Sequence, residues 1–484
     1  MTDFPSPGGW LVAASERHPQ APALAGVCAR DYGQLVAEAD GLGARLVARG
    51  VCRGQLVVVQ LASAQQLAGL LYAALRLGVT LLPLDPAMEP ARRERLLAGV
   101  GCDFLVSHQP PAAPGMGWIV PHELFAAPPA GVAPAGVNPL GGRSLSGDQI
   151  QLIIATSGTS GEPKGVMLSA ANLAASVAAS ERRLGLGVTD CWLACLPLFH
   201  IGGLSILLRC LAAGARVLLQ EGFEVAEVWQ QIAAGEVSHV SLVPAMLERL
   251  LIQADRPPPP TLRVVLIGGG PLSRSLAQRA HAAGWPLCVS YGMSETASQF
   301  ATDCSPTAGL TPGRVGRPLE GYQVSIGSAG RIRVRGPAVM RGYANPAGAA
   351  GLGLERGWFE TGDLGRLDGQ GRLTVIGRAD DLLVSGGKNI HPSEVEERLL
   401  ACPGVTAVGV TGRADPVWGV TLVALFSGEV AAAALAEWSR EHLPGHLRPR
   451  EFLPIEQLPR NAMGKLSRAA LQELLEQHPP ADQA

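Results

Sequence analysis

The chain has 484 residues, of which 47% are apolar and 17% are charged, and its formal net charge is −2. This length and composition predict a globular protein with two or more domains, because a single hydrophobic core stops growing well below this size. The small net charge excludes bulk electrostatics as a reason to expect a nucleic-acid or membrane-surface partner.

The N-terminal residues 1–10 have neither a basic start nor an apolar core, so we expect no secretory signal and a cytoplasmic protein. The nine cysteines include no Cys-x-x-Cys pair. Cys191 and Cys195 with His200 offer a fragment of a metal site, but no fourth ligand has suitable spacing. We therefore expect reduced thiols. The apolar segment Leu67–Leu84 is interrupted by an arginine, a glycine and a proline, which favours a buried helix and strand over a membrane span.

The first half of the chain has the pattern of a parallel α/β protein. A strand after Gln55, a helix over Ala64–Leu77 and a strand over Val79–Leu84 predict a βαβ unit. Further strand and helix patterns follow at Ala215–Leu219, Val225–Ala234, Val240–Val243, Ala245–Gln253 and Leu262–Ile267. These patterns indicate parallel sheets covered by helices, in which ligands gather at the carboxyl ends of the strands.

Beyond residue 310 the pattern changes to short strands separated by glycines, at Gln323–Ile326, Gly330–Arg335 and Arg372–Ile376. A small β-rich subdomain is expected there. After Asp380 the α/β character returns, with helices and strands expected over Pro392–Leu400, Val405–Val410, Val420–Phe426, Ala432–His442 and Ala469–Glu476. We place a domain boundary near residues 378–383.

The stretch Thr156–Gly165 is rich in glycine and hydroxyl side chains and contains Lys164. Glycines let backbone N–H groups turn toward an anion, and the hydroxyls and the lysine add donors and charge. A Walker A loop is disfavoured, because Pro163 precedes the lysine and Gly165 follows it. Taken alone, the stretch fits either a phosphate cradle or a flexible surface loop.

Five further stretches contain glycines, hydroxyls, carboxylates or lysines of the same chemical character: Gly268–Pro271, Ser290–Thr296, Trp358–Asp363, Gly377–Ile390 and Pro459–Lys465. Together and in this order, the six stretches strongly resemble the acyl-adenylate-forming superfamily, which contains acyl-CoA synthetases, firefly-type luciferases and the adenylation domains of peptide synthetases. The resemblance runs from the βαβ unit near residue 55 to the lysine of the last stretch.

The resemblance implies an α/β fold in two domains. The large N-terminal AMP-binding domain, residues 1–379, would have parallel α/β subdomains and a small β-barrel-like subdomain. A small, mobile α+β domain, residues 380–484, would act as a lid that carries the catalytic lysine.

Four stretches look most like the o-succinylbenzoate–CoA ligase branch, which belongs to menaquinone and phylloquinone biosynthesis: Leu196–Ile206, Tyr291–Gln299, Ser385–Ile390 and Asp415–Gly419. This implies a ligase that converts o-succinylbenzoate, ATP and CoA to o-succinylbenzoyl-CoA, AMP and pyrophosphate. The implied ligands are a small carboxylic acid, ATP, Mg²⁺ and CoA as co-substrate, without nucleic acid or membrane insertion. A homodimer is common among such enzymes.

The resemblance assigns the polyphosphate and the departing pyrophosphate to the first stretch, through Thr156, Ser157, Gly158, Thr159, Ser160 and Lys164. Glu295 resembles the Mg²⁺ ligand, because a hard cation takes carboxylate oxygen beside phosphate oxygen. Thr296 would contact the α-phosphate. The alternative for the glutamate is a solvated side chain on a turn.

The nucleoside would be held by four groups. Tyr291 would stack on adenine, with Gly269 and Gly270 allowing the purine close to the backbone. Asp363 would accept hydrogen bonds from the ribose hydroxyls, and Arg378 would assist at ribose or phosphate. A core tyrosine and a surface ion pair are the competing interpretations.

Lys465 resembles the lysine that bridges the substrate carboxylate and the α-phosphate during transfer. Asp380 resembles the hinge at which the C-terminal domain turns between the two half-reactions. Gly386 and Gly387 would face the path of pantetheine. His200 lies where this family keeps a bulky ring that gates the acyl pocket, and a packed core histidine is the alternative.

The acid substrate is the least determined part. A second substrate carboxylate would meet Arg209 or a hydroxyl such as that of Thr302. The alternatives are another aryl- or medium-chain acyl-CoA ligase, a stand-alone adenylation enzyme that loads a carrier protein, and a non-catalytic nucleotide-binding relative.

Overall fold

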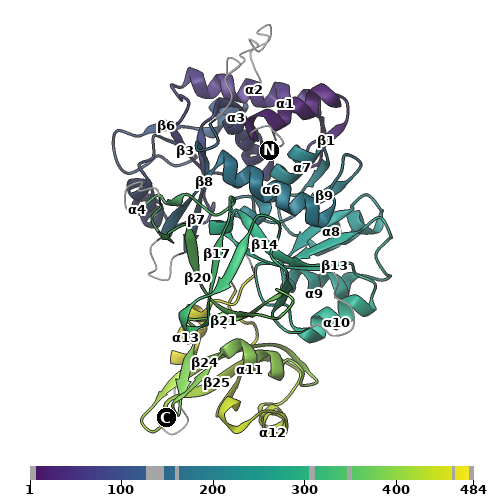
Figure 1. Ribbon diagram of the computed structural model, residues 1–484, viewed down its shortest axis with the longest axis vertical. Coiled ribbons are helices and arrows are strands. Elements are labelled where there is room, and N and C mark those ends of the chain that lie inside the picture. The colour runs from purple at the N-terminus through teal and green to yellow at the C-terminus, as the bar shows by residue number, and fades with distance from the viewer. Residues whose placement is uncertain are drawn as a thin grey trace.

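A computed structural model describes residues 7–126, 146–157, 163–304, 311–345, 351–460 and 464–478 of the chain. Two large sheets with helices between them lie above a smaller C-terminal domain (Figure 1). This mixed α/β architecture with parallel sheets confirms the predicted fold class.

The first large sheet has seven strands in the order β18-β8-β7-β4-β3-β5-β6. Strands β7, β4, β3, β5 and β6 are parallel, whereas β8 and β18 join antiparallel at one edge. Their bounds are β3 Leu56–Gln60, β4 Thr80–Pro83, β5 Phe104–Ser107, β6 Gly117–Ile119, β7 Ile150–Ser157, β8 Pro163–Ser169 and β18 Gly342–Tyr343. Strands β3 and β4 are buried along nearly their whole length, as expected for parallel strands covered on both faces.

The second large sheet has eight strands in the order β14-β13-β12-β11-β9-β10-β1-β2. The six inner strands are parallel, and β14 and β2 are antiparallel edges. Their bounds are β1 Pro22–Gly26, β2 Arg30–Asp31, β9 Cys191–Ala194, β10 Arg216–Leu219, β11 His239–Leu242, β12 Val264–Ile267, β13 Leu287–Met293 and β14 Ser298–Asp303.

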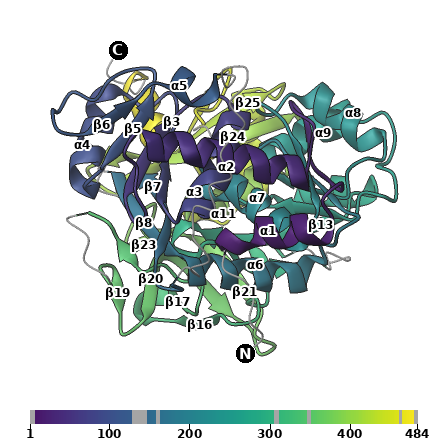
Figure 2. The same ribbon diagram turned by 90° about the horizontal axis from the view of Figure 1, so that it is seen from above.

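Five helices form one packed layer with buried residues from both large sheets: α1 Pro7–Arg17, α2 Tyr32–Ala48, α3 Ala64–Leu77, α6 Ala170–Leu184 and α7 Ile201–Ala213. Figure 2 shows α1 and α2 side by side over this layer. Helix α3 has the bounds that its sequence predicts. Ser63 caps its N-terminus, and Gly78 ends it in the left-handed region at φ 67°.

The remaining helices of this part of the chain cover the outer faces. The second sheet packs against α8 Val225–Ala233, α9 Pro244–Gln253 and α10 Arg274–Ala282. Residues of α4, Pro90–Val100, join the buried cluster on the outer face of the first sheet. The short helix α5, Pro121–Phe125, lies beside α2.

The predicted β-rich region is a six-stranded antiparallel sheet with the path β15-β21-β20-β17-β16, and β19 pairs with β20. Its strands are β15 Arg314–Gly316, β16 Gln323–Ile326, β17 Arg331–Arg335, β19 Leu354–Glu355, β20 Trp358–Leu367 and β21 Leu373–Arg378. The described strands follow an open path from β15 to β16, and a barrel stays a prediction. The 3₁₀ turn η2, Ser328–Gly330, lies near β20 of this sheet, whereas η1, Ser294–Thr296, lies near β8 and β14 of the two large sheets.

The C-terminal domain has its own buried clusters, drawn from residues 383–475. Its elements are β22 Leu383–Ser385, β23 Lys388–Ile390, α11 Pro392–Leu399, β24 Val405–Asp415, β25 Gly419–Gly428, α12 Ala432–His442, η3 Gly445–Leu447, β26 Glu451–Pro454 and α13 Arg468–Glu476. Figure 1 places this domain below the antiparallel sheet, with β21 leading into it.

One expectation about the thiols is wrong. Cys288 at the start of β13 and Cys304, just after β14, form a disulfide. The pair meets because β13 and β14 run antiparallel, with Val289 opposite Asp303, so the residues that flank this position are neighbours. The other cysteines are free thiols.

None of the helices in the described part of the chain is long and apolar enough to cross a membrane.

Candidate active site

The hydroxyl- and glycine-rich stretch connects two antiparallel strands, β7 and β8. Thr156 lies opposite Lys164 in this pairing, and its hydroxyl donates a hydrogen bond to the lysine carbonyl at 3.4 Å. The lysine ammonium lies 5.1 Å from the centre of the Tyr343 ring. Ser157 ends β7. Gly158, Thr159 and Ser160 lie outside the described residues, so their predicted phosphate contacts stay predictions.

Asn345 holds the closing end of this loop, a role that the sequence did not indicate. Its side-chain amide donates to the Pro163 carbonyl at 2.8 Å and accepts from the Gly165 N–H at 2.8 Å. These two bonds bracket Lys164. The contact spans about 180 positions, and no local pattern around the asparagine marked it.

Glu295 lies on η1, in the turn that joins β13 to β14. Its carboxylate accepts a hydrogen bond from the Tyr343 hydroxyl at 2.9 Å. Burial raises the pKa of this carboxyl group, while the hydrogen bond from Tyr343 and the charge of Lys164 act in the opposite direction. A carboxylate that is costly to keep ionised in this place is suited to a nearby cation.

The carboxylate at this position fits Mg²⁺, which binds partly through substrate phosphates, better than a metal ion that is held by protein ligands alone. No group of three or more His, Cys, Asp or Glu side chains among the described residues could hold a metal ion. Mg²⁺ commonly takes one or two carboxylates together with substrate phosphates and water. Glu295 supplies one such carboxylate at the end of the turn that faces the loop lysine.

Thr296 is fully buried, and its hydroxyl is engaged by its own turn. The hydroxyl accepts from the Met293 N–H at 3.1 Å and lies 2.7 Å from the Ser298 carbonyl, to which it donates. The side chain thus stabilises the turn that presents Glu295. Its predicted contact with the α-phosphate stays a prediction.

The residues proposed for the nucleoside come from β13, β20 and β21 and from the segment that follows β12. The Tyr291 hydroxyl on β13 donates to the Asp363 carboxylate on β20 at 2.6 Å. Asp363 lies opposite Arg378 of β21, and their charged atoms are 3.6 Å apart. Gly269 and Gly270 follow β12, the strand beside β13, and the first has a φ of 76°.

Lys465 comes from the C-terminal domain but faces this group. Part of its side chain is exposed to solvent, although protein surrounds the ammonium group closely enough to reduce its solvation. That burial lowers its pKa, while Asp363 and Glu295 act to raise it. A Cβ added at the preceding Gly464 would lie 3.1 Å from Val243, so the lysine loop closely approaches the N-terminal region.

His200 precedes α7 and occupies its N-cap position. Its ring packs against that of Phe199, with centres 4.6 Å apart. Burial lowers the pKa of His200 to about 4, with the charge of Asp85 opposing this shift and that of Lys465 adding to it. The ring is therefore neutral at pH 7, which suits a steric gate more than a charged contact.

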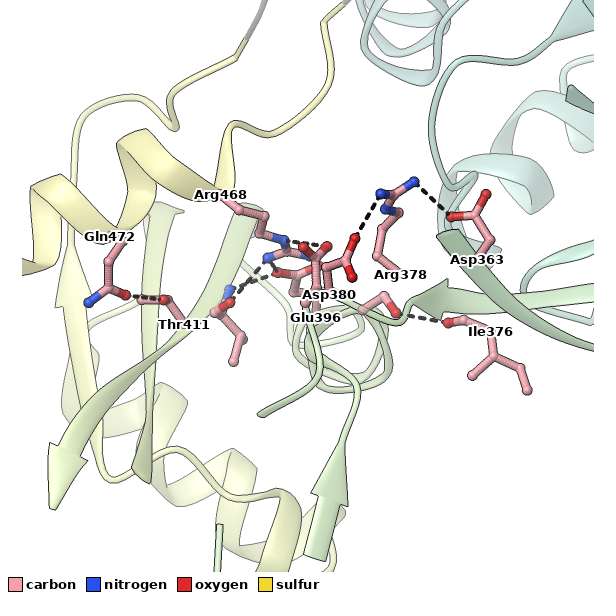
Figure 3. A network of polar contacts seen from close by, with 11 residues as sticks. Asp363, Ile376, Arg378, Asp380, Glu396, Thr411, Arg468 and Gln472 are labelled. Atoms are coloured by element: carbon pink, nitrogen blue, oxygen red, sulfur yellow. Dashed lines mark hydrogen bonds and ion pairs between the residues drawn. The ribbon is translucent and has the colours of Figure 1, made fainter. Parts of the chain in front are cut away.

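Arg378 also reaches the predicted hinge. Its guanidinium lies 3.1 Å from the Asp380 carboxylate on one side and 3.6 Å from Asp363 on the other (Figure 3). The arginine thus joins the nucleoside group to the predicted hinge.

A separate pocket of about 250 Å³ lies in the C-terminal domain. Gly386 and Gly387 form the turn between β22 and β23 at φ 54° and 75°, and the first lines this pocket. Basic and aromatic side chains complete the lining: Lys388, Trp418, His446, Arg448 and Arg450. The Arg450 guanidinium lies 4.6 Å from the centre of the Trp418 ring. No role was assigned to Arg448 or Arg450 from the sequence, although they are only two positions apart in the chain.

Arg209 and Thr302, the two candidates for a second substrate carboxylate, are both buried. Arg209 lies 5.3 Å above the Trp192 ring and donates to the Ser298 hydroxyl at 2.9 Å. Its Nε and the Thr302 hydroxyl have no hydrogen-bond partner among the described residues. Burial lowers the pKa of this arginine to about 10. A buried cation with a free donor favours an anionic ligand.

Comparison with known proteins gives two family matches. A model described as AMP-binding enzyme matches residues 11–344, and one described as AMP-binding enzyme C-terminal domain matches residues 394–465. Two similar curated proteins are named 2-succinylbenzoate–CoA ligase. The Bacillus mycoides protein is 39% identical over 342 residues, 68% of this chain and 71% of the relative. The Bacillus licheniformis protein is 34% identical over 490 residues, 97% of this chain and 100% of the relative.

Solved structures of related enzymes agree with these family matches. o-Succinylbenzoate CoA synthetase from Bacillus subtilis, in complex with the acyl-adenylate intermediate OSB-AMP, has a TM-score of 0.86 and 32% identity over 96% of this chain and 98% of that one. Its complex with ATP and magnesium ion has the same score and identity over 96% and 99%. ATP-bound MatB from Rhodopseudomonas palustris has a TM-score of 0.85 and 25% identity over 97% and 99%.

Proposed function

This chain belongs to the AMP-binding enzyme family, and on that premise we propose that it joins o-succinylbenzoate to CoA. The reaction proceeds through an acyl-adenylate and releases AMP and pyrophosphate, as a step of menaquinone biosynthesis. The observation that supports the proposal is that Lys465 of the C-terminal domain is near enough for the charges of Asp363 and Glu295 to raise its pKa. A two-domain arrangement with residues 1–379 and 380–484, a homodimer and a cytoplasmic location stay predictions.

The first half-reaction needs charge neutralisation and positioning, because a carboxylate is a poor nucleophile and the triphosphate repels it. We assign ribose to Asp363, whose orientation Tyr291 and Arg378 fix through a hydrogen bond and an ion pair. Lys164 steadies the polyphosphate from β8. Lys465 bridges the substrate carboxylate and the α-phosphate as charge moves onto the leaving pyrophosphate.

Glu295 would hold Mg²⁺ together with the phosphate oxygens, and the bound ion would neutralise the polyphosphate. Tyr343 orients this carboxylate by donating to it, and the same ring lies under the Lys164 ammonium.

The second half-reaction transfers the acyl group to the thiol of CoA. We assign the phosphates of CoA to the pocket of the C-terminal domain, because Lys388, Arg448 and Arg450 provide positive charge beside the Gly386 turn. Guanidinium groups bind phosphate through paired, charge-assisted hydrogen bonds. Trp418 offers a ring for stacking. This basic lining favours CoA over a carrier protein as the acceptor.

A panel of acids tests the substrate assignment. With ATP and Mg²⁺, pyrophosphate release should be fastest with o-succinylbenzoate, and slow with benzoate and medium-chain fatty acids. Release that is equal with every acid would contradict the assignment, and release without thioester formation from CoA would favour carrier-protein loading. Continuous detection of pyrophosphate gives the rates.

Arg209→Met supplies the control for this panel. If Arg209 meets the second carboxylate, the variant should lose about 10- to 100-fold in kcat/KM for o-succinylbenzoate, as expected when a buried charged contact is lost. The rate with benzoate should change little. A matched loss with both acids would place the effect in folding rather than in recognition.

Charge reversal in the C-terminal pocket should weaken CoA selectively. The double variant Arg448→Glu with Arg450→Glu should raise the KM for CoA at least about tenfold, which corresponds to 1.4 kcal/mol. Adenylate formation without CoA should be unaffected. Arg440→Glu on α12 is the matched control, because this exposed arginine pairs with Glu437 and lies outside the pocket lining. An unchanged KM for CoA would remove the pocket from the mechanism.

A further inference from the structure

Arg468 joins three separate segments of the C-terminal domain. It is the first residue of α13, and its guanidinium makes a two-pronged contact with Glu396 of α11. It also donates to the Val410 carbonyl of β24 at 3.1 Å. Its Nε lies 3.4 Å from the carboxylate of Asp381, the residue directly after the predicted hinge. One side chain therefore holds α11, α13, β24 and the start of the domain together.

This anchor is largely enclosed by protein. The side chains of Arg468, Glu396 and Asp381 are 29%, 11% and 28% exposed. Glu396 also accepts the Val410 N–H at 2.7 Å, so its charge is compensated from two sides. Two-pronged arginine–carboxylate contacts fix orientation as well as distance. The anchor is therefore stiff compared with a surface ion pair.

The two neighbouring aspartates at the predicted hinge pair with arginines from different parts of the chain. Asp380 pairs with Arg378, which belongs to β21 and also contacts Asp363. Asp381 pairs with Arg468 of the C-terminal domain. Figure 3 shows Arg378 reaching from the hinge side toward Asp363, and Arg468 reaching from α13 toward Glu396. The peptide between the two aspartates thus separates a segment tied to one domain from a segment tied to the other.

The same anchor lies next to the catalytic loop. Arg468 follows Lys465 by three positions, and Ser467 caps α13 through the Ala470 N–H. The Ser467 N–H donates to the Pro459 carbonyl at 2.9 Å, which closes the loop at its base. A rotation about Asp380 is therefore transmitted through Asp381 and Arg468 to the lysine.

We propose that Arg468 is a positioning residue that makes Lys465 turn as one body with the hinge, by holding Asp381 against Glu396 at the start of α13. This inference rests on the proposed ligase function. It assigns no contact with substrate to Arg468. For a given backbone conformation at Asp380, the Arg468 side chain determines where Lys465 lies.

Asp381→Asn tests the proposal, because it cuts the hinge end of the anchor and leaves Arg468 and Glu396 paired. Single-turnover adenylate formation should slow by roughly 10- to 100-fold, the scale expected when a catalytic group is misplaced by about 1 Å. The KM for ATP should stay within about twofold, because the proposed ribose, Mg²⁺ and polyphosphate contacts lie in the other domain. The unfolding midpoint should also be unchanged.

A second variant guards against an effect of folding. Arg468→Lys keeps a charge beside Glu396, but a single ammonium cannot serve both carboxylates and the Val410 carbonyl. It should show the same loss of rate, and the double variant should be no slower than Arg468→Lys alone. Additive losses, or an Asp381→Asn rate within about twofold of the parent, would overturn the proposal.

Glu451→Gln is the matched control. It breaks a two-pronged pair with Arg413 in the same domain, away from the hinge, and should leave adenylate formation unchanged. The parent enzyme must release pyrophosphate with the acid used. If the parent is inactive with every acid, the proposed function fails, whereas an active parent with an unaffected Asp381→Asn variant refutes only the role of Arg468.

Discussion

Lys465→Ala should reduce the rate of acyl-adenylate formation by roughly 10³-fold, the upper range for removal of one preorganised electrostatic contact. In the structure this lysine belongs to the C-terminal domain, but the charges of Asp363 and Glu295 act on its pKa. Its own charge in turn acts on the pKa of His200. We therefore expect its charge to act where the carboxylate attacks and pyrophosphate departs. Conversion of supplied acyl-adenylate and CoA to thioester should stay largely intact, because that step displaces AMP from an already activated acyl group.

The two half-reactions are measured separately in single-turnover experiments. Lys388→Ala is the matched control, since it removes a lysine of the same domain that lines the other pocket. It should leave adenylate formation within about twofold of the parent. Equal loss of both half-reactions in the Lys465 variant would show that the lysine does not act specifically in adenylation.

Asp380→Pro should spare adenylate formation and impair thioester formation, which is the reverse of the result expected for Lys465→Ala. Proline fixes φ near −65° and restricts the residue before it, so the backbone at the hinge cannot take a second conformation. The lysine already faces the nucleoside group in this structure, and adenylate formation should persist. Thioester formation should fall by roughly 10²-fold, because the Gly386 turn and its basic pocket cannot be brought to the acyl-adenylate.

Asp380→Ala separates rotation from the ion pair. It removes the contact with Arg378 at 3.1 Å but leaves φ free. This variant should retain thioester formation, whereas the proline variant should not. Unaffected overall turnover in Asp380→Pro would contradict the hinge assignment. Rates with supplied acyl-adenylate and CoA decide between these outcomes.

Local signals account for the elements that the sequence predicted well. Helix α3 has its predicted bounds because Ser63 and Gly78 cap it within the same short segment. Helix α12 spans Ala432–His442 as expected from its periodicity. Strands β3 and β4 are mostly apolar and flank the predicted helix α3, and this order indicated a parallel sheet before any pairing was known.

The pairing of distant strands accounts for what the sequence did not show. The disulfide depends on β13 lying antiparallel to β14. Asn345 reaches the phosphate loop only because β18 pairs with β8. In each case the two partners meet through strand pairing, and the sequence around either partner has no pattern that indicates the contact.

Lysine usage shows how much chemical information the sequence itself contains. The chain has only three lysines, Lys164, Lys388 and Lys465, and each lies in a stretch that resembles the acyl-adenylate-forming superfamily. The sequence therefore determined the family, the order of the chemical groups and the reaction class.

Only the tertiary structure decided which groups act together. It brought Lys465 within the electrostatic influence of Asp363 and Glu295, and it paired Asp380 with Arg378 but Asp381 with Arg468. It also gathered Arg448 and Arg450 around Trp418. The physical reason is that charge–charge contacts and hydrogen bonds act over a few ångströms in space, whereas these residues are brought together by strand pairing and domain packing rather than by neighbouring positions in the chain.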